Sequence, residues 1–199
     1  MKKQLITMTL ATLLGSSVLS AAEELNAAAE GENFRHKEEN VYVVAKGLIT
    51  SGHTITEENA RVEGKNGRGV GIDLGYRTGT GLNFEVDYAY TKLDVTEKGD
   101  AEEVSATGDY NSFSFDALYA YHINEPLAIF GKIGIEYEME KIDKLNVDKS
   151  SSGFTYGAGF EYEIQENLAL IAEYEDSTID GPKGYTIAAG LVFGLDLFE

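Results

Sequence analysis

The stretch LNFEVDYAY, residues 82–90, alternates between two kinds of side chain. One parity holds large apolar or aromatic residues: Leu82, Phe84, Val86, Tyr88 and Tyr90. The other parity holds small or polar residues, including Glu85 and Asp87. Because successive side chains of a β-strand point to opposite faces, this period of two predicts a strand with one apolar face and one acidic face. The fold depends on which of these faces meets the solvent.

The same alternation continues from about residue 40 to the end of the chain. It predicts eight strands, near residues 40–52, 68–78, 82–96, 109–123, 126–142, 152–164, 168–178 and 184–198. Strands in soluble domains average about five or six residues. A strand tilted across a bilayer needs about nine to eleven. The lengths therefore favour strands that cross a membrane.

The connections between these strands alternate between short and long. The short turns lie at 77–81, 123–126 and 165–167, and the longer polar connections lie near 53–67, 97–108, 143–151 and 177–184. Short turns at one rim and long loops at the other are typical of outer-membrane barrels. We therefore predict an all-β, eight-stranded antiparallel up-and-down transmembrane barrel with both chain ends at the short-turn rim.

Tyrosines mark the predicted short-turn rim. Tyr76, Tyr121 and Tyr162 each stand six positions before a leucine on the far side of a short turn. Tyrosine is enriched where a protein leaves the bilayer, because its ring is apolar while its hydroxyl can stay hydrated. This spacing predicts an aromatic girdle at that rim.

The volume of the large side chains decides between two orientations of the faces. If they pointed inward, as in a soluble periplasmic ligand-binding barrel, they would overfill an eight-stranded cylinder, whose interior is only just wide enough for side chains. Pointing outward, they meet lipid, and the narrow interior receives Gly, Ala, Ser and charged residues. The predicted interior charges are Lys46, Arg77, Lys132, Asp73, Glu85, Asp87, Asp116, Glu136, Glu161 and Glu173. Buried charges must be paired or hydrated.

The N-terminus has the features of a secretory signal peptide. Lys2 and Lys3 precede a short apolar run at 5–14, and small residues at 20–22 offer a cleavage site. We predict a signal peptide at 1–22, a flexible periplasmic leader at 23–39 and a barrel domain at 40–199. The formal net charge of −18 argues against nucleic-acid binding, and the absence of Cys excludes disulfides and thiolate metal sites.

Together these features resemble the small outer-membrane β-barrel proteins of the OmpA, OmpX and opacity-protein type. The resemblance covers residues 40–199 and rests on the signal peptide, the strand count, the unequal rims, and cations such as Arg77 and Lys132 facing acids. It implies a cell outer-membrane location with periplasmic termini. It also implies contacts with membrane lipid, lipopolysaccharide, the barrel-assembly machinery and periplasmic chaperones. The final strand departs from the family pattern, because Phe198 is out of phase and Glu199 follows it.

The leading functional prediction is a non-enzymatic structural barrel without catalytic residues, metal or cofactor. A filled interior leaves room for at most a narrow channel, and excess acid inside would make it prefer cations.

Three alternatives remain open on the sequence. The first is a lipid A-modifying enzyme, for which Ser51 and His53 could share one strand face, with Glu57 and Glu58 nearby. The second is a surface adhesin that binds a partner through its long loops. The acids Asp100, Glu102 and Glu103 in one loop lack the spacing of an EF-hand. The third is the soluble barrel with reversed faces.

Overall fold

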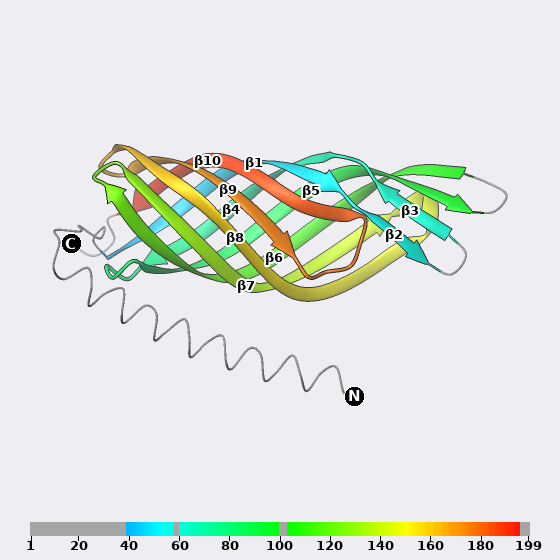
Figure 1. Cartoon of the computed structure of the whole chain (residues 1–199), viewed down its shortest axis with the longest axis horizontal. Coiled ribbons are helices and arrows are strands. Elements are labelled where there is room, and N and C mark those ends of the chain that lie inside the picture. The colour runs from blue at the N-terminus through cyan, green and yellow to red at the C-terminus, as the bar shows by residue number, and fades with distance from the viewer. Residues whose placement is uncertain (1–38, 58–59, 100–102, 196–199) are drawn as a thin grey trace, which may run out of the picture. The chain divides into compact units, whose positions relative to one another are not determined.

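Long antiparallel strands dominate the computed structural model, which describes residues 39–57, 60–99 and 103–195. Eight of these strands form the barrel wall: β1 (Asn40–Gly52), β4 (Gly67–Arg77), β5 (Leu82–Gly99), β6 (Glu103–Asn124), β7 (Leu127–Ile142), β8 (Val147–Gln165), β9 (Leu168–Ser177) and β10 (Lys183–Leu195). Each pairs with its sequence neighbours around the wall, as Figure 1 shows. The up-and-down order predicted from the hairpin turns is confirmed.

The ring closes because the first and last wall strands pair with each other. On β1, Val44 lies opposite Asp73 of β4 on one side and opposite Val192 of β10 on the other. The β5–β6 pairing completes the circuit. A closed ring leaves no unpaired wall edge, and in a bilayer every backbone polar group must be satisfied within the protein.

Three of the predicted loops are instead continuations of the sheet. The connection predicted at 53–67 contains two paired strands, β2 (Thr54–Glu57) and β3 (Ala60–Gly64). β5 and β6 extend through most of 97–108, and a 3-10 turn, η1 (Asp143–Leu145), separates β7 from β8. The prediction was wrong because it took polar composition as a loop signal. Backbone pairing in fact continues beyond the apolar band, which is the stretch of the wall strands that carries large outward apolar side chains.

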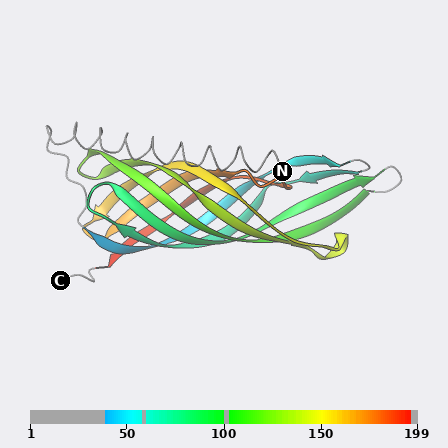
Figure 2. The same cartoon turned by 90° about the horizontal axis from the view of Figure 1, so that it is seen from below.

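These continuations form a projection that we call the extension: β2, β3 and the adjoining ends of β5, β6, β7 and β8. Figure 2 shows the β2–β3, β5–β6 and β7–β8 hairpins projecting at one end of the barrel, with the short turns at the other. The turn at 77–81 is tight enough to place Gly79 and Gly81 at positive φ. The barrel therefore has two unequal ends, as the sequence predicted.

Several predictions concern residues outside the described part of the chain. They are the signal peptide at 1–22, all of the 23–39 leader except Glu39, and the chain end at Phe198 and Glu199. In the part that the structure describes, we find no helical segment with the length and hydropathy needed to cross a bilayer.

The large apolar side chains point away from the barrel axis. Ile72, Phe115 and Ile135 are 53%, 52% and 59% exposed, and the same holds around the wall. Meanwhile Asp73 and Asp116, next to two of them in sequence, are 1% and 0% exposed. The face assignment of a soluble ligand-binding barrel is therefore wrong for this chain, since such a barrel would bury its isoleucines and phenylalanines.

Glycines on the inward parity make room for large inward side chains of neighbouring strands. A Cβ atom built on Gly75 would lie 2.1 Å from the Tyr42 ring, and one on Gly159 would lie 2.5 Å from the Phe130 ring. The narrow lumen can thus hold a few large side chains, because the glycines beside them have no side chain.

Replacing Gly75 with valine should destabilise the barrel. The new side chain would overlap Tyr42, and overpacking costs about 1–3 kcal/mol. Urea unfolding of the barrel refolded into detergent micelles would measure this loss. Gly131→Val is the matched control, because the nearest atom to its added Cβ is 4.0 Å away and the position is exposed on the outer surface. Equal stability of the two variants would contradict the packing argument.

Candidate functional site in the barrel interior

Lys46 joins three strands inside the barrel. Its Nζ lies 2.8 Å from Asp73 Oδ2 on β4 and 2.6 Å from Glu173 Oε1 on β9. Its side chain is only 5% exposed. Such close, charge-assisted contacts are needed to offset the cost of taking an ammonium out of water.

Lys132 makes the second centre of the same network. Its Nζ lies 2.5 Å from Glu175 and 3.2 Å from Asp87, with Asp116 at 3.9 Å and Glu173 at 3.8 Å. Glu173 therefore contacts both lysines. We define the central ion cluster by its members: Lys46, Lys132, Asp73, Asp87, Asp116, Glu173 and Glu175.

Arg77 forms a separate group near the short turns. Its Nη2 donates hydrogen bonds of 3.1 and 3.0 Å to the two carboxylate oxygens of Glu161. The guanidinium also lies 4.2 Å from the centre of the Tyr42 ring, a cation–π distance. The Tyr42 hydroxyl in turn donates a 2.6 Å hydrogen bond to Glu85.

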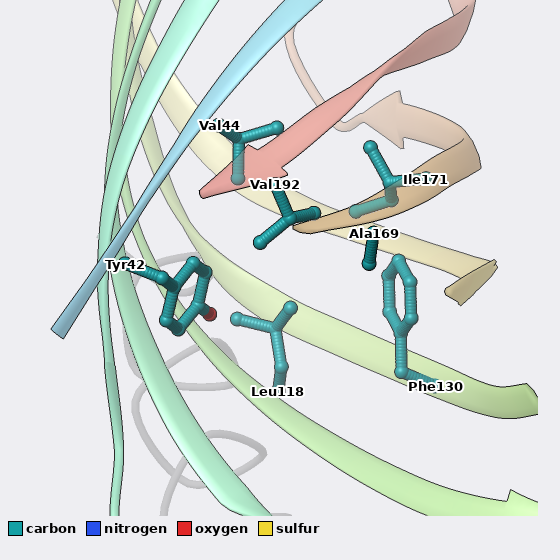
Figure 3. Close-up of a cluster of buried hydrophobic side chains, with 7 residues drawn as sticks. All are labelled: Tyr42, Val44, Leu118, Phe130, Ala169, Ile171 and Val192. Atoms are coloured by element: carbon teal, nitrogen blue, oxygen red, sulfur yellow. The ribbon is translucent and has the colours of Figure 1, made fainter. Parts of the chain in front are cut away.

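An apolar layer, which we call the plug, lies between Arg77 and the central ion cluster. Its members are Tyr42, Val44, Leu118, Phe130, Ala169, Ile171 and Val192. In Figure 3 they point toward one another across the lumen. On three strands the charged residue follows two positions after the plug residue: Val44 and Lys46, Phe130 and Lys132, Ile171 and Glu173.

The plug corrects the prediction that only small and charged residues fill the interior. The sequence carried a signal for it, because Phe130 and Ile171 lie on the inward parity of their strands. A second apolar group, also not predicted, lies toward the extension and consists of Leu93, Val95, Ala106, Tyr110 and Ile142.

Lys183 is an interior cation that the sequence pattern did not predict. Its Nζ reaches across the lumen to Ser112 at 3.0 Å, Glu136 at 2.9 Å and Glu138 at 2.5 Å. The register between β1 and β10 shifts between Thr50 and Gly52, which lies opposite Lys183. This irregularity puts Lys183 inside although its sequence parity is that of the outward residues, so simple alternation could not reveal it.

Three further acids were also missed, namely Glu138, Glu140 and Glu175. Glu140 accepts a 2.8 Å hydrogen bond from Tyr110 and lies 2.9 Å from Lys149. Glu138 and Glu140 share the parity of Glu136, so the alternation along β7 could have identified both. Glu175 likewise shares the parity of Glu173.

The interior is nearly filled. One cavity of about 30 Å³ borders the central ion cluster, with Lys46, Asp87 and Glu173 in its lining. A second, of about 20 Å³, is lined by Arg77, Glu161 and His122 near the short turns. A water molecule needs roughly 10–15 Å³ by this measure, so each cavity has room for one or two.

Tyrosines lie at both ends of the apolar band. At the short-turn end, Tyr121 and Tyr162 are 39% and 46% exposed, and the Tyr76 hydroxyl donates to Glu39. Toward the extension, four tyrosines donate to polar side chains: Tyr88 to Asn111, Tyr90 to Asp109, and Tyr156 and Tyr174 to Asp176. The short turns in the sequence predict only the first group of tyrosines, not this second one.

The residues considered for catalysis are not assembled into a reactive pair. β1 ends at Gly52, and in the described chain no hydrogen bond joins Ser51 to exposed His53. The pairing of β1 with β10 shifts register between Thr50 and Gly52, so simple alternation does not extend to His53. Glu58, Asp100 and Glu102 lie outside the described residues, as does the side chain of Glu57.

Removing the charge of Lys132 should cost stability. In Lys132→Met the acids around a fully buried ammonium lose their partner, and breaking a buried ion pair costs about 3–5 kcal/mol. Lys92→Met serves as the control, because Lys92 pairs with Asp109 at 3.2 Å with 54% of its side chain exposed. Exposed pairs contribute about 0–1 kcal/mol. Urea unfolding should separate the two, and a Lys132→Met barrel as stable as wild type would refute the role of this lysine.

Comparisons with known proteins agree with this architecture. The chain is 28% identical to outer membrane protein X of Escherichia coli K12 over 158 residues, which is 75% of this chain and 85% of that protein. The crystal structure of OprG from Pseudomonas aeruginosa superimposes with a TM-score of 0.65 at 13% identity, covering 81% of this chain and 98% of that chain. Ail from Yersinia pestis, crystallised with the heparin analogue sucrose octasulfate, gives 0.52 at 23% identity, covering 79% and 100%.

The family model described as the outer membrane protein beta-barrel domain matches residues 9–194. This span includes all eight wall strands apart from Leu195, the last residue of β10. Its match agrees with the outward apolar band and the eight-stranded wall. The chain belongs to the outer membrane protein beta-barrel family.

Proposed function

We propose that the protein is a non-enzymatic structural barrel of the outer membrane with a narrow lumen that favours cations over anions. The observation that carries this proposal is the excess of acid inside. Three lysines, Lys46, Lys132 and Lys183, face eight buried or half-buried acids: Asp73, Glu85, Asp87, Asp116, Glu136, Glu138, Glu173 and Glu175. A lumen lined in this way repels anions and attracts cations.

The plug argues for a small conductance. Hydrophobic constrictions stop ions by excluding water, and an eight-stranded lumen is otherwise filled by side chains. The cavity of about 30 Å³ lies on one side of the plug, beside the central ion cluster, and the cavity of about 20 Å³ lies on the other side, beside Arg77. The two cavities therefore do not form one wide passage. The role that best fits such a filled cylinder is structural, with ion passage only when the plug side chains move.

The orientation follows from the family and from the unequal ends. We infer that the short turns and both termini face the periplasm and that the extension faces outward, as short periplasmic turns and longer outer loops are usual in such barrels. The barrel-assembly machinery and periplasmic chaperones belong to the same inference.

Selectivity in a planar lipid bilayer tests the channel proposal. Under a potassium chloride gradient, the refolded barrel should give small conductance steps whose reversal potential shows preference for K⁺. The double variant Asp87→Asn/Glu173→Gln, which removes two lumen charges, should reduce that preference. Asp94→Asn is the control, because Asp94 is exposed in the extension. Anion selectivity, or equal effects of the lumen and control variants, would refute the proposal.

A second candidate function is attachment through the extension, and its charge pattern favours this. Arg61 lies directly opposite Lys98 across β3 and β5, and Arg68 lies opposite Lys92 across β4 and β5. We call these four residues the basic stripe. Like charges directly opposite each other are unfavourable in a sheet, so two such pairs in so acidic a chain suggest an anionic partner.

Acids offset only part of the basic stripe. Glu63 pairs with Arg61 at 2.9 Å and with Lys98 at 2.7 Å. The Lys98 hydrogen bond is the main reason that the pKa of Glu63 lies below its ordinary value, so this carboxylate stays ionised. Arg68 has no ion pair with any residue that the structure describes, and it lies just beyond the exposed Val70 of the apolar band. Phosphates of lipopolysaccharide would meet Arg68 and Lys92 there.

Retention on immobilised heparin tests the attachment proposal. The relative Ail was crystallised with a heparin analogue, which makes a sulfated sugar the appropriate probe. Wild-type barrel in detergent should be retained and released by salt, and Arg61→Gln/Lys98→Gln should elute at markedly lower salt. Lys144→Gln/Lys149→Gln is the charge-matched control, because Lys144 is exposed in η1 and Lys149 pairs with Glu140, both away from the basic stripe. No retention of wild type, or equal elution of both variants, would exclude this partner class.

A further inference from the structure

Three buried carboxylates of β4 and β5 converge beside the central ion cluster. They are Asp73, Glu85 and Asp87, and one oxygen of each lies within 4.8 Å of the others. Their exposed fractions are 1%, 2% and 6%, so water screens their charges poorly.

The register of the sheet enforces this convergence. Asp73 lies directly opposite Asp87, and Glu85 occupies the next inward position along β5. Like charges directly opposite each other destabilise a strand pair. Lys46 and Lys132 offset part of this repulsion through the Oδ2 atoms, at 2.8 Å from Asp73 and 3.2 Å from Asp87 respectively.

The other oxygens of both aspartates provide an independent sign of a ligand. Oδ1 of Asp73 and Oδ1 of Asp87 are buried, yet neither accepts a hydrogen bond from the described residues. Leaving a buried charged acceptor without a hydrogen-bond partner is unfavourable, because the oxygen has lost its water and gained no replacement. A cation held between these oxygens would remove that cost.

Local charge and space both fit such a cation. Two lysines of the central ion cluster face Asp73, Glu85, Asp87, Asp116, Glu173 and Glu175, which leaves a net negative interior. The cavity of about 30 Å³ that Asp87 lines could hold water ligands. Oxygen ligands in an irregular arrangement suit Ca²⁺, whereas Mg²⁺ demands near-octahedral geometry.

We propose that Asp73, Glu85 and Asp87 bind one divalent cation, with Ca²⁺ the best fit, inside the closed barrel. The ion would neutralise the facing aspartates and tie β4 to β5 at mid-lumen. This site does not depend on ion conduction, because it exists in the conformation whose plug is intact.

Tyr42 provides a local reporter for the proposed ion. Its hydroxyl donates to Glu85 at 2.6 Å, and the chain contains no Trp to compete for excitation. In the refolded barrel, Tb³⁺ used in place of Ca²⁺ should give saturable luminescence on tyrosine excitation, and Ca²⁺ should displace it. Tyr42→Phe keeps all three carboxylates, so Ca²⁺ affinity by calorimetry should persist while Tb³⁺ emission falls several-fold.

Carboxylate variants test the ligands directly. Asp73→Asn and Asp87→Asn should each weaken Ca²⁺ binding at least tenfold. Glu138→Gln, an interior acid paired with Lys183, should not. Heat-modifiable gel migration would check that each variant is folded.

Three results would overturn the proposal. The first is no saturable Ca²⁺ binding by wild type at neutral pH, which would mean that protons neutralise the carboxylates. The second is binding unchanged in both folded aspartate variants, which would place the ion at the surface. The third, decisive if the aspartate variants do not fold, is undiminished Tb³⁺ emission from Tyr42→Phe.

Discussion

Ionic contact inside a closed cylinder is the constraint on which this structure depends. Once β1 pairs with β10, inward side chains can no longer reach bulk water along the wall, and each charge must be satisfied across the lumen. Lys46 and Lys132 meet this requirement by contacting acids from four other strands, β4, β5, β6 and β9. The same contacts hold opposite walls at a fixed spacing. The polar interior therefore fixes the positions of the strands, as an apolar core does in a soluble protein.

The outer surface follows a simpler requirement. Lipid needs no shape-specific packing partner, so Ile72, Phe115 and Ile135 can stand exposed side by side. Tyrosines with hydroxyls bonded to Asn111, Asp109 and Asp176 mark where this band ends toward the extension. Beyond them the same strands continue with charged and hydroxyl side chains, because backbone pairing does not depend on the surrounding solvent.

The short turns were sufficient to predict the strand order. Period-two alternation was sufficient to predict the outward apolar face and the inward position of residues such as Lys46 and Asp87. It depends only on the geometry of an unbroken strand, and most of the wall is unbroken. It failed at Lys183, where a register shift opposite Gly52 changes the parity. It put Phe130 on the inward parity but could not show that this side chain fits, because an inward Phe130 is acceptable only when Gly159 leaves space on the next strand, and that pairing is set by three-dimensional register.

The pairing of β1 with β10 also determines how the molecule can form. Val41 finds its partner only when Leu195 is available, near the opposite end of the chain. Contacts so distant in sequence are slow to establish, because a long loop must close before any pairing energy is gained. An unfinished chain would expose two open strand edges, which are templates for aggregation. Closing the ring therefore needs both ends of the barrel domain at once, and no shorter piece of this chain that lacks β10 can satisfy the free edge of β1.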